Sequence, residues 1–256
     1  MKKVFLGILG GVTILCVVFG TLWHFGAFSG GKAKFSMNFP FFGDKGIAGD
    51  FSDTQLLPQT MTELCIDTSV ANLTVQVGSV NSVEMKWTHD YLEPTVTVEG
   101  SVVHIEQQRK RINASGNSKC SITVTVPPQL SVVKIETDVG NVESENVSAS
   151  NAKFESDVGN VRIEGGTFTS LIAKSDTGNI RVEGASFDTC TADSDVGNVR
   201  IELPSDVNGQ DYSVSLKTDV GNVHAFGQSY KQTFTQSVPG GKFINAQSDV
   251  GNVNVE

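Results

Sequence analysis

Metal-binding and disulfide patterns are scarce in this chain. Its 256 residues include only four cysteines and four histidines. The cysteines, at positions 16, 65, 120 and 190, fall in no CxxC or Cys/His spacing. This argues against a zinc site and against a small fold held together by disulfides. A disulfide between Cys65 and Cys120 stays open, because their separation does not follow from the sequence.

Basic residues are scarce as well. The chain has 19 Lys and Arg against 28 Asp and Glu, which gives a net charge of -9. Because nucleic-acid binding depends on basic residues that neutralise phosphates, we expect no nucleic-acid partner. The one basic run, at residues 109–111, is typical of a solvated loop. Contact of this run with an anionic polymer or a lipid headgroup is the alternative.

A catalytic signature is also missing, since no Ser/His/Asp arrangement and no Gly-rich phosphate loop occurs. Polysaccharide-processing enzymes built on β-helices place carboxylates with Arg or Lys on one exposed strand face. The candidates for such a site are Asp188, Asp193 and Asp195 near Arg200. The repeat described below, or surface solubility, explains each of these carboxylates. We therefore predict a protein without catalytic residues and without a cofactor.

Charge is absent from one long stretch near the N-terminus. The 25 residues from Val4 to Phe28 include no Asp, Glu, Lys or Arg, and a bilayer is crossed by about 20 apolar residues. Two lysines before the stretch place the N-terminus in the cytoplasm by the positive-inside rule. We predict that residues 1–28 are a single-pass transmembrane anchor, or an uncleaved signal, that contacts the membrane through residues 4–28. The protein would then be a cell-membrane protein with an extracytoplasmic C-terminal domain. A signal peptide cleaved after Ser29 is disfavoured, because its apolar region normally spans only about 7–15 residues.

Residues 29–55 mix Gly, Ser and charged residues, a composition typical of a flexible juxtamembrane linker. Five phenylalanines lie among them, at positions 35, 39, 41, 42 and 51. The alternative is that this cluster lies in the headgroup layer or docks on a membrane partner.

A repeated five-residue string dominates the second half of the chain. DVGNV begins at Asp138, Asp157, Asp195, Asp219 and Asp249, and its variant DTGNI begins at Asp176. Successive copies are 19, 19, 19, 24 and 30 residues apart. Such a period indicates a repeated supersecondary unit whose copies stack on one another.

Each copy has the pattern of strands and turns rather than of helices. Val161 and Ile163 alternate with Arg162 and Glu164, which is the period of a half-buried strand. Asp-Val-Gly-Asn fits a tight turn in which Gly takes the position that needs a positive φ. A circuit of 19 residues that stacks ~4.8 Å from the next describes one coil of a β-solenoid. We therefore predict an all-β fold, a single-stranded β-helix, preceded by one N-terminal transmembrane helix.

Two columns of the repeat are predicted to face the core. They consist of Val142, Val161, Ile180, Val199, Val223 and Val253, and of Ser144, Ile163, Val182, Ile201, Ala225 and Val255. All but Ser144 are apolar. Cys190 shares another apolar column with Ala152 and Leu171, so we expect it to be a buried thiol.

The turn residues form further columns. We expect a structural role for Gly140, Asn141, Gly159, Asn160, Gly178, Asn179, Gly197, Asn198, Gly221, Asn222, Gly251 and Asn252, with the asparagines bonded from coil to coil. The carboxylates of Asp138, Asp157, Asp176, Asp195, Asp219 and Asp249 either bond their own turn amides or share Ca²⁺. The glycine-rich nonapeptide of calcium-binding rolls is absent, so calcium is the minor alternative.

Charged residues occupy the outward positions of the same strands. The two outward columns are Glu143, Arg162, Arg181 and Arg200, and Glu145, Glu164, Glu183 and Glu202. Opposite signs in adjacent columns predict a solvated ion-pair lattice, with each pair worth ~0–1 kcal/mol. An acidic ligand-binding face is the alternative.

The repeat also suggests how the domain begins and ends. Residues 56–131 alternate like strands without the regular spacing, so we predict an irregular β segment that opens the solenoid, followed by regular DVGN coils at 132–256. The last coil stops one strand into its circuit. Its edge is open unless the 11-residue excess of the preceding coil (30 − 19 = 11) folds over it. An uncovered C-terminal edge would be the place for self-association.

The phrase SITVTVPP, followed by SVVKIETDVGNV and the reiterated D-V/T-G-N-V/I units, resembles the bacterial DUF4097 family of adhesin-like, or toastrack, β-solenoids. The resemblance covers roughly residues 56–256 and is strongest at KIETDVGNV and SLKTDVGNV. It implies a single-stranded β-helix displayed on the cell surface. It also implies that some members of the family are linked to envelope-stress systems of the Lia type. It implies no catalytic residues.

The acidic excess belongs to the repeat half of the chain. Residues 132–256 carry 18 acidic and 9 basic residues, and residues 1–131 carry 10 of each, so 9 − 18 = -9 accounts for the whole net charge. Such a solenoid repels anionic polymers unless cations bridge them. We predict a non-enzymatic, membrane-anchored envelope scaffold or stress-sensing interaction module with an envelope protein as partner. The alternatives are a surface adhesin that binds cell-wall polymer or a glycan, and a β-helix polysaccharide-processing enzyme.

Overall fold

The computed structural model describes residues 47–107 and 118–256. Residues Met1–Phe42 and Gly43–Glu256 form separate units, and the described residues all belong to the second. The predicted anchor, most of the predicted linker and the basic run at 109–111 lie outside the described residues. None of the helices in the described part of the chain has the length and apolar character needed to cross a membrane.

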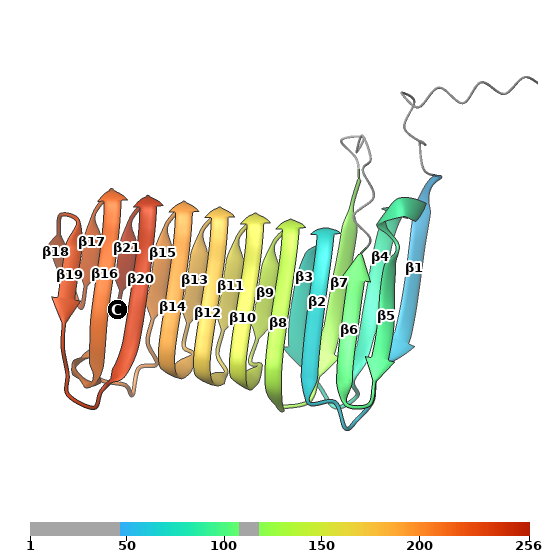
Figure 1. Ribbon diagram of the computed structural model, residues 1–256, viewed down its shortest axis with the longest axis horizontal. Helices are drawn as coiled ribbons and strands as arrows, with labels where there is room; N and C mark the ends of the chain where they lie inside the picture. Colours follow the sequence, from blue (N-terminus) through green and yellow to red (C-terminus); the bar gives the residue numbers. More distant parts are fainter. Residues whose placement is uncertain (1–46, 108–117) are drawn as a thin grey trace, which may run out of the picture. The chain divides into compact units, whose positions relative to one another are not determined.

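The domain consists of two β-sheets that face each other (Figure 1). The eleven strands of sheet A are β1 (Ala48–Leu56), β3 (Asn72–Val77), β4 (Ser82–His89), β7 (Cys120–Val126), β9 (Val142–Glu145), β11 (Val161–Glu164), β13 (Ile180–Glu183), β15 (Val199–Glu202), β17 (Val223–Ala225), β18 (Gln228–Tyr230) and β21 (Val253–Val255). The ten strands of sheet B are β2 (Glu63–Val70), β5 (Pro94–Glu99), β6 (Val102–Gln107), β8 (Gln129–Val139), β10 (Ser148–Val158), β12 (Thr167–Thr177), β14 (Ser186–Val196), β16 (Tyr212–Val220), β19 (Thr233–Gln236) and β20 (Lys242–Val250). Two short 3-10 helices, η1 (Asp90–Leu92) and η2 (Gly209–Asp211), complete it.

Each regular coil contributes one long strand to sheet B and one short strand to sheet A. The Asp-Val-Gly-Asn turn joins the two strands. Neighbouring coils pair in parallel with a 19-residue offset, so that Val161 lies between Val142 and Ile180. The predicted all-β solenoid and its 19-residue coil are confirmed in this register.

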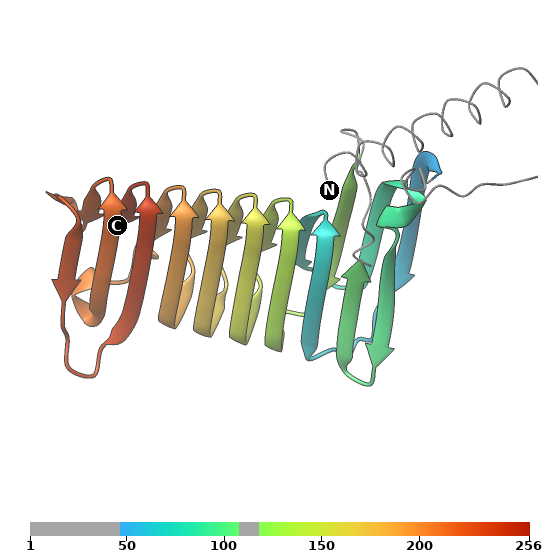
Figure 2. The same ribbon diagram turned by 45° about the horizontal axis from the view of Figure 1, so that its top comes forward.

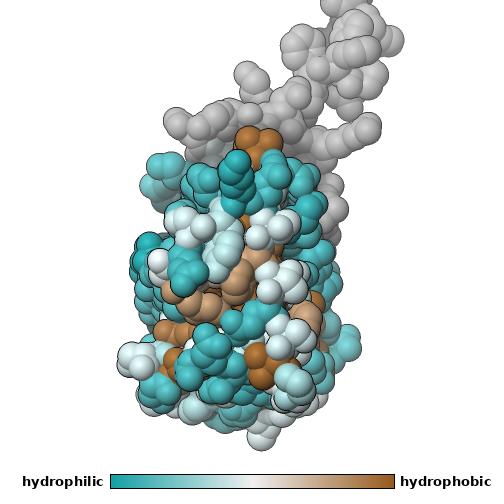
Figure 3. All heavy atoms as spheres, turned by 90° about the vertical axis from the view of Figure 1, so that its left-hand side faces the viewer, coloured by the Kyte–Doolittle hydropathy of each residue, from teal (hydrophilic) through white to brown (hydrophobic). Residues whose placement is uncertain are grey.

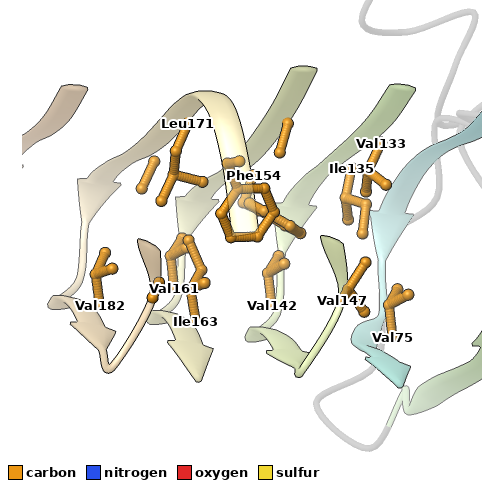
Figure 4. Close-up of a cluster of buried hydrophobic side chains, with 14 of the residues drawn as sticks. Val75, Val133, Ile135, Val142, Val147, Phe154, Val161, Ile163, Leu171 and Val182 are labelled. Carbon is orange, nitrogen blue, oxygen red and sulfur yellow. The ribbon is translucent and has the colours of Figure 1, made fainter. Parts of the chain in front are cut away.

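Apolar side chains from both sheets fill the space between them. Figure 4 shows part of this core, where Val142, Val161 and Val182 of sheet A face Ile135, Phe154 and Leu171 of sheet B. All members of the two predicted core columns are buried, including Ser144. The Oγ atom of Ser144 has no hydrogen-bond partner there, so the one polar exception in the columns is a local defect.

The structure differs from the sequence-based prediction at the start of the domain. Strand β1 begins at Ala48, inside the segment predicted as linker, and pairs antiparallel with β4. The ring of Phe51 stacks on Trp87 with 5.9 Å between centroids. The sequence AGDFSDTQL of β1 lacks alternating apolar residues, because this strand is exposed along most of its length. The rest of the irregular segment holds two further coils, β2/β3 and β6/β7, which pair in parallel with each other.

The C-terminal coil is not the last coil in space, and the prediction of an open edge there is wrong. Strand β20 pairs with β14 and β16, and β21 pairs with β15 and β17. The coil at residues 242–256 is therefore inserted between two coils that precede it in the chain (Figure 2). Identical turns make this possible, since each DVGN coil stacks on any other with the same geometry.

Residues 226–241 turn back over the outermost coil instead. They form β18 and β19, which pair antiparallel with β17 and β16. Figure 3 views this C-terminal end, where hydrophobic residues are scattered among hydrophilic ones. The excess residues between the last two repeats do cover an edge, but it is the edge of the 212–225 coil.

Candidate functional site

The corner that joins sheet B to sheet A is built in the same way in every coil. The last residue of each sheet B strand, just before the corner, pairs with the same position in the next coil. In spatial order these residues are Val70, Val139, Val158, Thr177, Val196, Val250 and Val220. The predicted turn columns therefore lie in straight rows along the domain. The upstream corner at Val70-Ala71-Asn72 belongs to the same rows.

Glycine is required in this corner because the coils approach each other closely. A Cβ atom on Gly178 would lie 2.0 Å from the carbonyl oxygen of Gly159 in the adjacent coil. The φ of Gly178 is 159°, a positive value that residues with a side chain rarely adopt, so the predicted turn conformation and the crowding between coils both exclude a side chain.

The asparagines of the corner form a hydrogen-bonded ladder. The backbone N–H of Asn160 donates to Oδ1 of Asn141 at 2.9 Å, and that of Asn179 donates to Asn160 at 2.9 Å. The ladder runs in spatial order through Asn72, Asn141, Asn160, Asn179, Asn198, Asn252 and Asn222. Each side chain except that of Asn222, at the end of the ladder, thus satisfies a backbone donor that no strand partner reaches.

A second ladder, of buried hydroxyls, escaped the sequence analysis. Ser175 Oγ donates to the carbonyl oxygen of Gly159 at 2.9 Å, and Ser194 Oγ to that of Gly178 at 2.9 Å. The donors are Thr137, Ser156, Ser175, Ser194, Ser248 and Thr218. The signal was present, since Ser or Thr precedes the aspartate of every repeat.

The aspartates of the corner point outward. Asp157, Asp176, Asp195, Asp219 and Asp249 are exposed, and Asp138 is half-buried. Within residues 47–107 and 118–256, no group of three His, Cys, Asp or Glu side chains could hold a metal ion. The geometry therefore offers the calcium alternative no ligand cluster.

An exposed aliphatic row lies next to these aspartates, and the sequence analysis missed it. Its members are Val139, Val158, Val196, Val250 and Val220, which are 46%, 51%, 51%, 48% and 64% exposed, with the exposed Thr177 in the same row. In the sequence, the valine of each DVGN string reads as part of the turn, which gives no sign that its side chain is exposed. Exposed apolar side chains that lie next to one another form the kind of surface patch on which proteins interact.

The outer face of sheet A carries the predicted ion-pair lattice. Arg162 pairs with Glu164 in its own strand and with Glu183 in the next, at 3.1 Å. Arg181 and Arg200 repeat the arrangement, with Arg200 reaching Glu256 at 3.2 Å. Each arginine lies between two glutamates, so the arginines are paired while the face as a whole stays acidic.

The outer face of sheet B has a similar network around Glu136. Burial alone would raise the pKa of Glu136, but hydrogen bonds from Lys153 and Lys134 outweigh it and lower this pKa below its usual value. Lys153 also contacts Glu155. Burial opposes the charge of Lys153, and the two glutamates reverse that effect and raise its pKa.

The carboxylates considered for catalysis do not come together with an arginine. Asp188 and Asp193 lie on β14 in sheet B, where they contact Lys242 and Gln247 at 3.5 and 2.8 Å. Arg200 lies on β15 in sheet A and binds glutamates. The structure therefore separates the proposed acid/base groups onto opposite sheets.

The described cysteines are free thiols. Cys65 lies in sheet B and Cys120 in sheet A, so the disulfide left open above is not formed. Burial raises the pKa of Cys120 and of Cys190 to about 12. At neutral pH both thiols are protonated and unreactive, as expected for Cys190.

A groove lies at the N-terminal end of the domain, between β1 and β5. It has a volume of about 490 Å³, and its lining includes the apolar residues Phe51, Trp87, Pro94 and Val96. Asp53 and Glu93 add two carboxylates. No sequence pattern pointed to this groove, because it is formed where two sheets of unequal strand number end.

Residues 67–256 match the sequence model of the family described as Toastrack DUF4097, which spans most of the chain. The chain belongs to the Toastrack family. The resemblance stated from the DVGN units is thereby confirmed. The Toastrack match begins within β2, so β1 lies outside it.

Solved structures with similar folds have low identity to this Toastrack chain. A "putative cell adhesion protein" from Clostridium sporogenes shares 15% identity at a TM-score of 0.45, covering 81% of this chain and 99% of its own. A "putative adhesin" from Bacteroides fragilis shares 14% identity at a TM-score of 0.45, covering 81% of this chain and 97% of its own. These likenesses carry no argument about function. No curated protein matches the chain.

Proposed function

We propose that this Toastrack protein is a non-enzymatic, membrane-anchored scaffold of the cell envelope that binds a partner protein along its DVGN corner. The observation that carries the proposal is the exposed row of Val139, Val158, Val196, Val250 and Val220 beside the exposed aspartates. Coils spaced ~4.8 Å apart present these side chains at a fixed interval, so the row suits an extended partner segment.

The two broad faces of the domain are less suited to binding. Their charged side chains are largely engaged with one another, as for Arg162 with Glu183 and Lys153 with Glu136. A ligand would have to replace these contacts. The corner row instead offers apolar area whose burial contributes roughly 25 cal/mol per Å².

Charge favours a protein partner over an anionic wall polymer. The repeat half carries 18 acidic against 9 basic residues. A polymer of phosphates or carboxylates would meet repulsion along the whole row, whereas a segment with lysine or arginine beside apolar residues would meet attraction.

Site-specific photo-crosslinking in intact cells tests this proposal. A photoreactive residue replaces Val158 in the full chain, and the matched control replaces Val80, which is equally exposed at 51% but lies away from the corner. We expect a discrete adduct with one envelope protein from position 158 and none from position 80. Equal labelling at both positions would contradict a dedicated corner site.

Binding of the purified full chain to purified cell wall separates the scaffold from the adhesin. Retention that survives physiological salt would favour adhesion to wall polymer and count against the scaffold.

Labelling of intact cells by a membrane-impermeant amine reagent tests the location, because an extracytoplasmic domain exposes Lys174 and its other lysines to the reagent. Labelling only after lysis would contradict the proposed orientation.

A further inference from the structure

The two sheets differ by one strand, eleven against ten, and the difference arises at the N-terminal end. At the C-terminal end both sheets stop together, at β18 and β19. At the N-terminal end sheet A continues through β7, β4 and β1, while sheet B continues only through β6 and β5. Among residues 47–107 and 118–256, strand β1 therefore extends beyond β5 with no strand of sheet B opposite it (Figure 1).

Inward-facing side chains below this overhang are partly exposed in the described part of the chain. Phe51 is paired with the buried Trp87, so its ring points toward the layer between the sheets. On β5, Val98 pairs with the buried Val103 and also points inward, yet it is 44% exposed. The groove of about 490 Å³ between β1 and β5 is the place that one more strand of sheet B would fill.

The backbone at this end offers a template for such a strand. Among the described residues, β5 pairs only with β6, so one edge of this six-residue strand carries unpaired N–H and C=O groups. The edge strands at the C-terminal end have only three and four residues. A long open edge above a groove is the arrangement that binds extended peptides by strand addition.

Charge identifies the chemistry of the occupant. The described residues that line the groove include Asp53 and Glu93 but neither a lysine nor an arginine. Strand β1 adds Asp50, and β5 ends with Glu99, so both strands at this end are acidic. A second copy of the chain would bring like charges together, whereas a basic segment would be attracted.

We propose that this groove binds an extended segment of a partner protein in which apolar residues alternate with a lysine or arginine. The segment adds to the free edge of β5 as the missing strand of sheet B. Its apolar side chains cover Val98, Val96 and Phe51, and its basic side chain lies near Asp53 and Glu93. This site is separate from the DVGN corner, so it can be tested independently of the corner proposal.

The probe is a capped nine-residue peptide with Val, Lys and Val at alternate positions and Thr between them. Amide hydrogen exchange of the full chain in lipid nanodiscs measures its binding. At 1 mM peptide we expect at least about fivefold slower exchange in β5 and no change in β19. No slowing in β5, or equal slowing in β19, would overturn the proposal.

Matched peptides and variants separate charge from strand addition. Replacing the peptide lysine by glutamate is expected to remove the effect, and so is methylation of the backbone nitrogens that face β5. In the protein, the exposed pair of changes Asp53→Asn and Glu93→Gln should weaken binding at least about fivefold, while Asp249→Asn should not. Equal binding of the glutamate peptide would overturn the charge argument and the proposed occupant with it.

Two further outcomes count against the proposed occupant. If β5 becomes protected as the protein concentration rises without peptide, the occupant is a second copy. The variant Val98→Lys places a charge on β5 two residues beyond the groove-lining Val96, on the same face of the strand, at a position that is already 44% exposed, so the domain should remain folded. Unchanged peptide protection in this variant would show that the peptide lies elsewhere.

Discussion

The two ends of the domain close the same stack of coils in different ways. At the C-terminal end, Phe234 packs against Phe226 and Tyr230, with ring centroids 6.3 and 4.8 Å apart, and both edge strands are short. At the N-terminal end, the nine-residue strand β1 extends past the described strands of the opposite sheet, and its Phe51 ring stacks on the single ring of Trp87. A solenoid needs a cap at each end to protect its core and its edges. One end of this domain is covered by the short strands β18 and β19, and the other keeps a groove.

The regular coils between the two ends show how stable the stack is where neither end contributes. Among the changes considered, the largest loss of stability is expected from a substitution of Gly178 in these coils. In Gly178→Val, a Cβ atom 2.0 Å from the oxygen of Gly159 forces adjacent coils apart. We expect a loss of at least about 3 kcal/mol in the free energy of unfolding, measured by denaturant titration.

The matched control for this change is Gly184→Asn. Gly184 has a φ of 62°, a left-handed backbone that asparagine tolerates, and no atom lies within 4 Å of the position that its Cβ atom would take. The expected cost of this change is below about 1 kcal/mol. Equal losses in both variants would show that crowding between coils is not what the glycine relieves.

Truncating one ring at each end measures how closed the ends are. Both Phe234 and Phe51 are half-buried, but Phe234 contacts two rings and Phe51 contacts one. We expect Phe234→Ala to cost about 2 kcal/mol and Phe51→Ala about 1 kcal/mol in urea unfolding, both less than a fully buried Phe. A larger loss at Phe51 would mean that the N-terminal end is the better packed of the two.

The middle of the domain was predictable from sequence because each coil repeats the same letters at the same spacing. Val161, Ile163 and Asn160 recur every 19 residues, which determines strand, core face and ladder together. The order of the C-terminal coils was not predictable. The repeats at Asp219 and Asp249 carry the same turn, so either stacks equally well on the coil at Asp195.

The candidate site was predictable in part. The turn glycines and asparagines follow from the repeat, and the hydroxyl ladder was visible in the Ser or Thr before each aspartate. The groove was not, because it depends on the number of strands in each sheet. Strand β1 was not predictable either, because its residues do not alternate between apolar and polar. Eight of its nine residues are exposed, so no buried face imposes such an alternation.

Ser144 marks the junction between the irregular and the regular coils, and removing its hydroxyl should stabilise the domain. It lies between Val75 and Ile163, buried, with no partner for its Oγ atom. We expect Ser144→Ala to raise the free energy of unfolding by about 1 kcal/mol.

The control is Ser156→Ala, because Ser156 Oγ donates to Gly140 at 2.7 Å and its loss should cost about 1 kcal/mol. Thermal and denaturant unfolding of the two variants should therefore move in opposite directions. A shift of the same sign in both would mean that Ser144 finds a partner in solution.

The smallest expected effect compares an ion pair in the middle of the stack with one near its C-terminal end as the pH falls. The pKa of Glu136 is lowered in the folded state because hydrogen bonds from Lys153 and Lys134 outweigh its burial. A carboxyl group with a lowered pKa stabilises the fold above its unfolded pKa, about 4.3 for Glu, and loses this contribution as the pH drops through the folded value. At pH 7, Glu136→Gln should therefore have a lower melting temperature than the wild type. At pH 2 the two proteins should have the same melting temperature. Near the C-terminal end, Asp219 pairs with Lys217 at 2.9 Å, but both side chains are more than half exposed, at 56% and 57%. Solvent screens that pair, so Asp219→Asn should leave the melting temperature unchanged at both pH values. A pH-dependent loss in Asp219→Asn as large as in Glu136→Gln would show that burial does not set the difference between the two pairs.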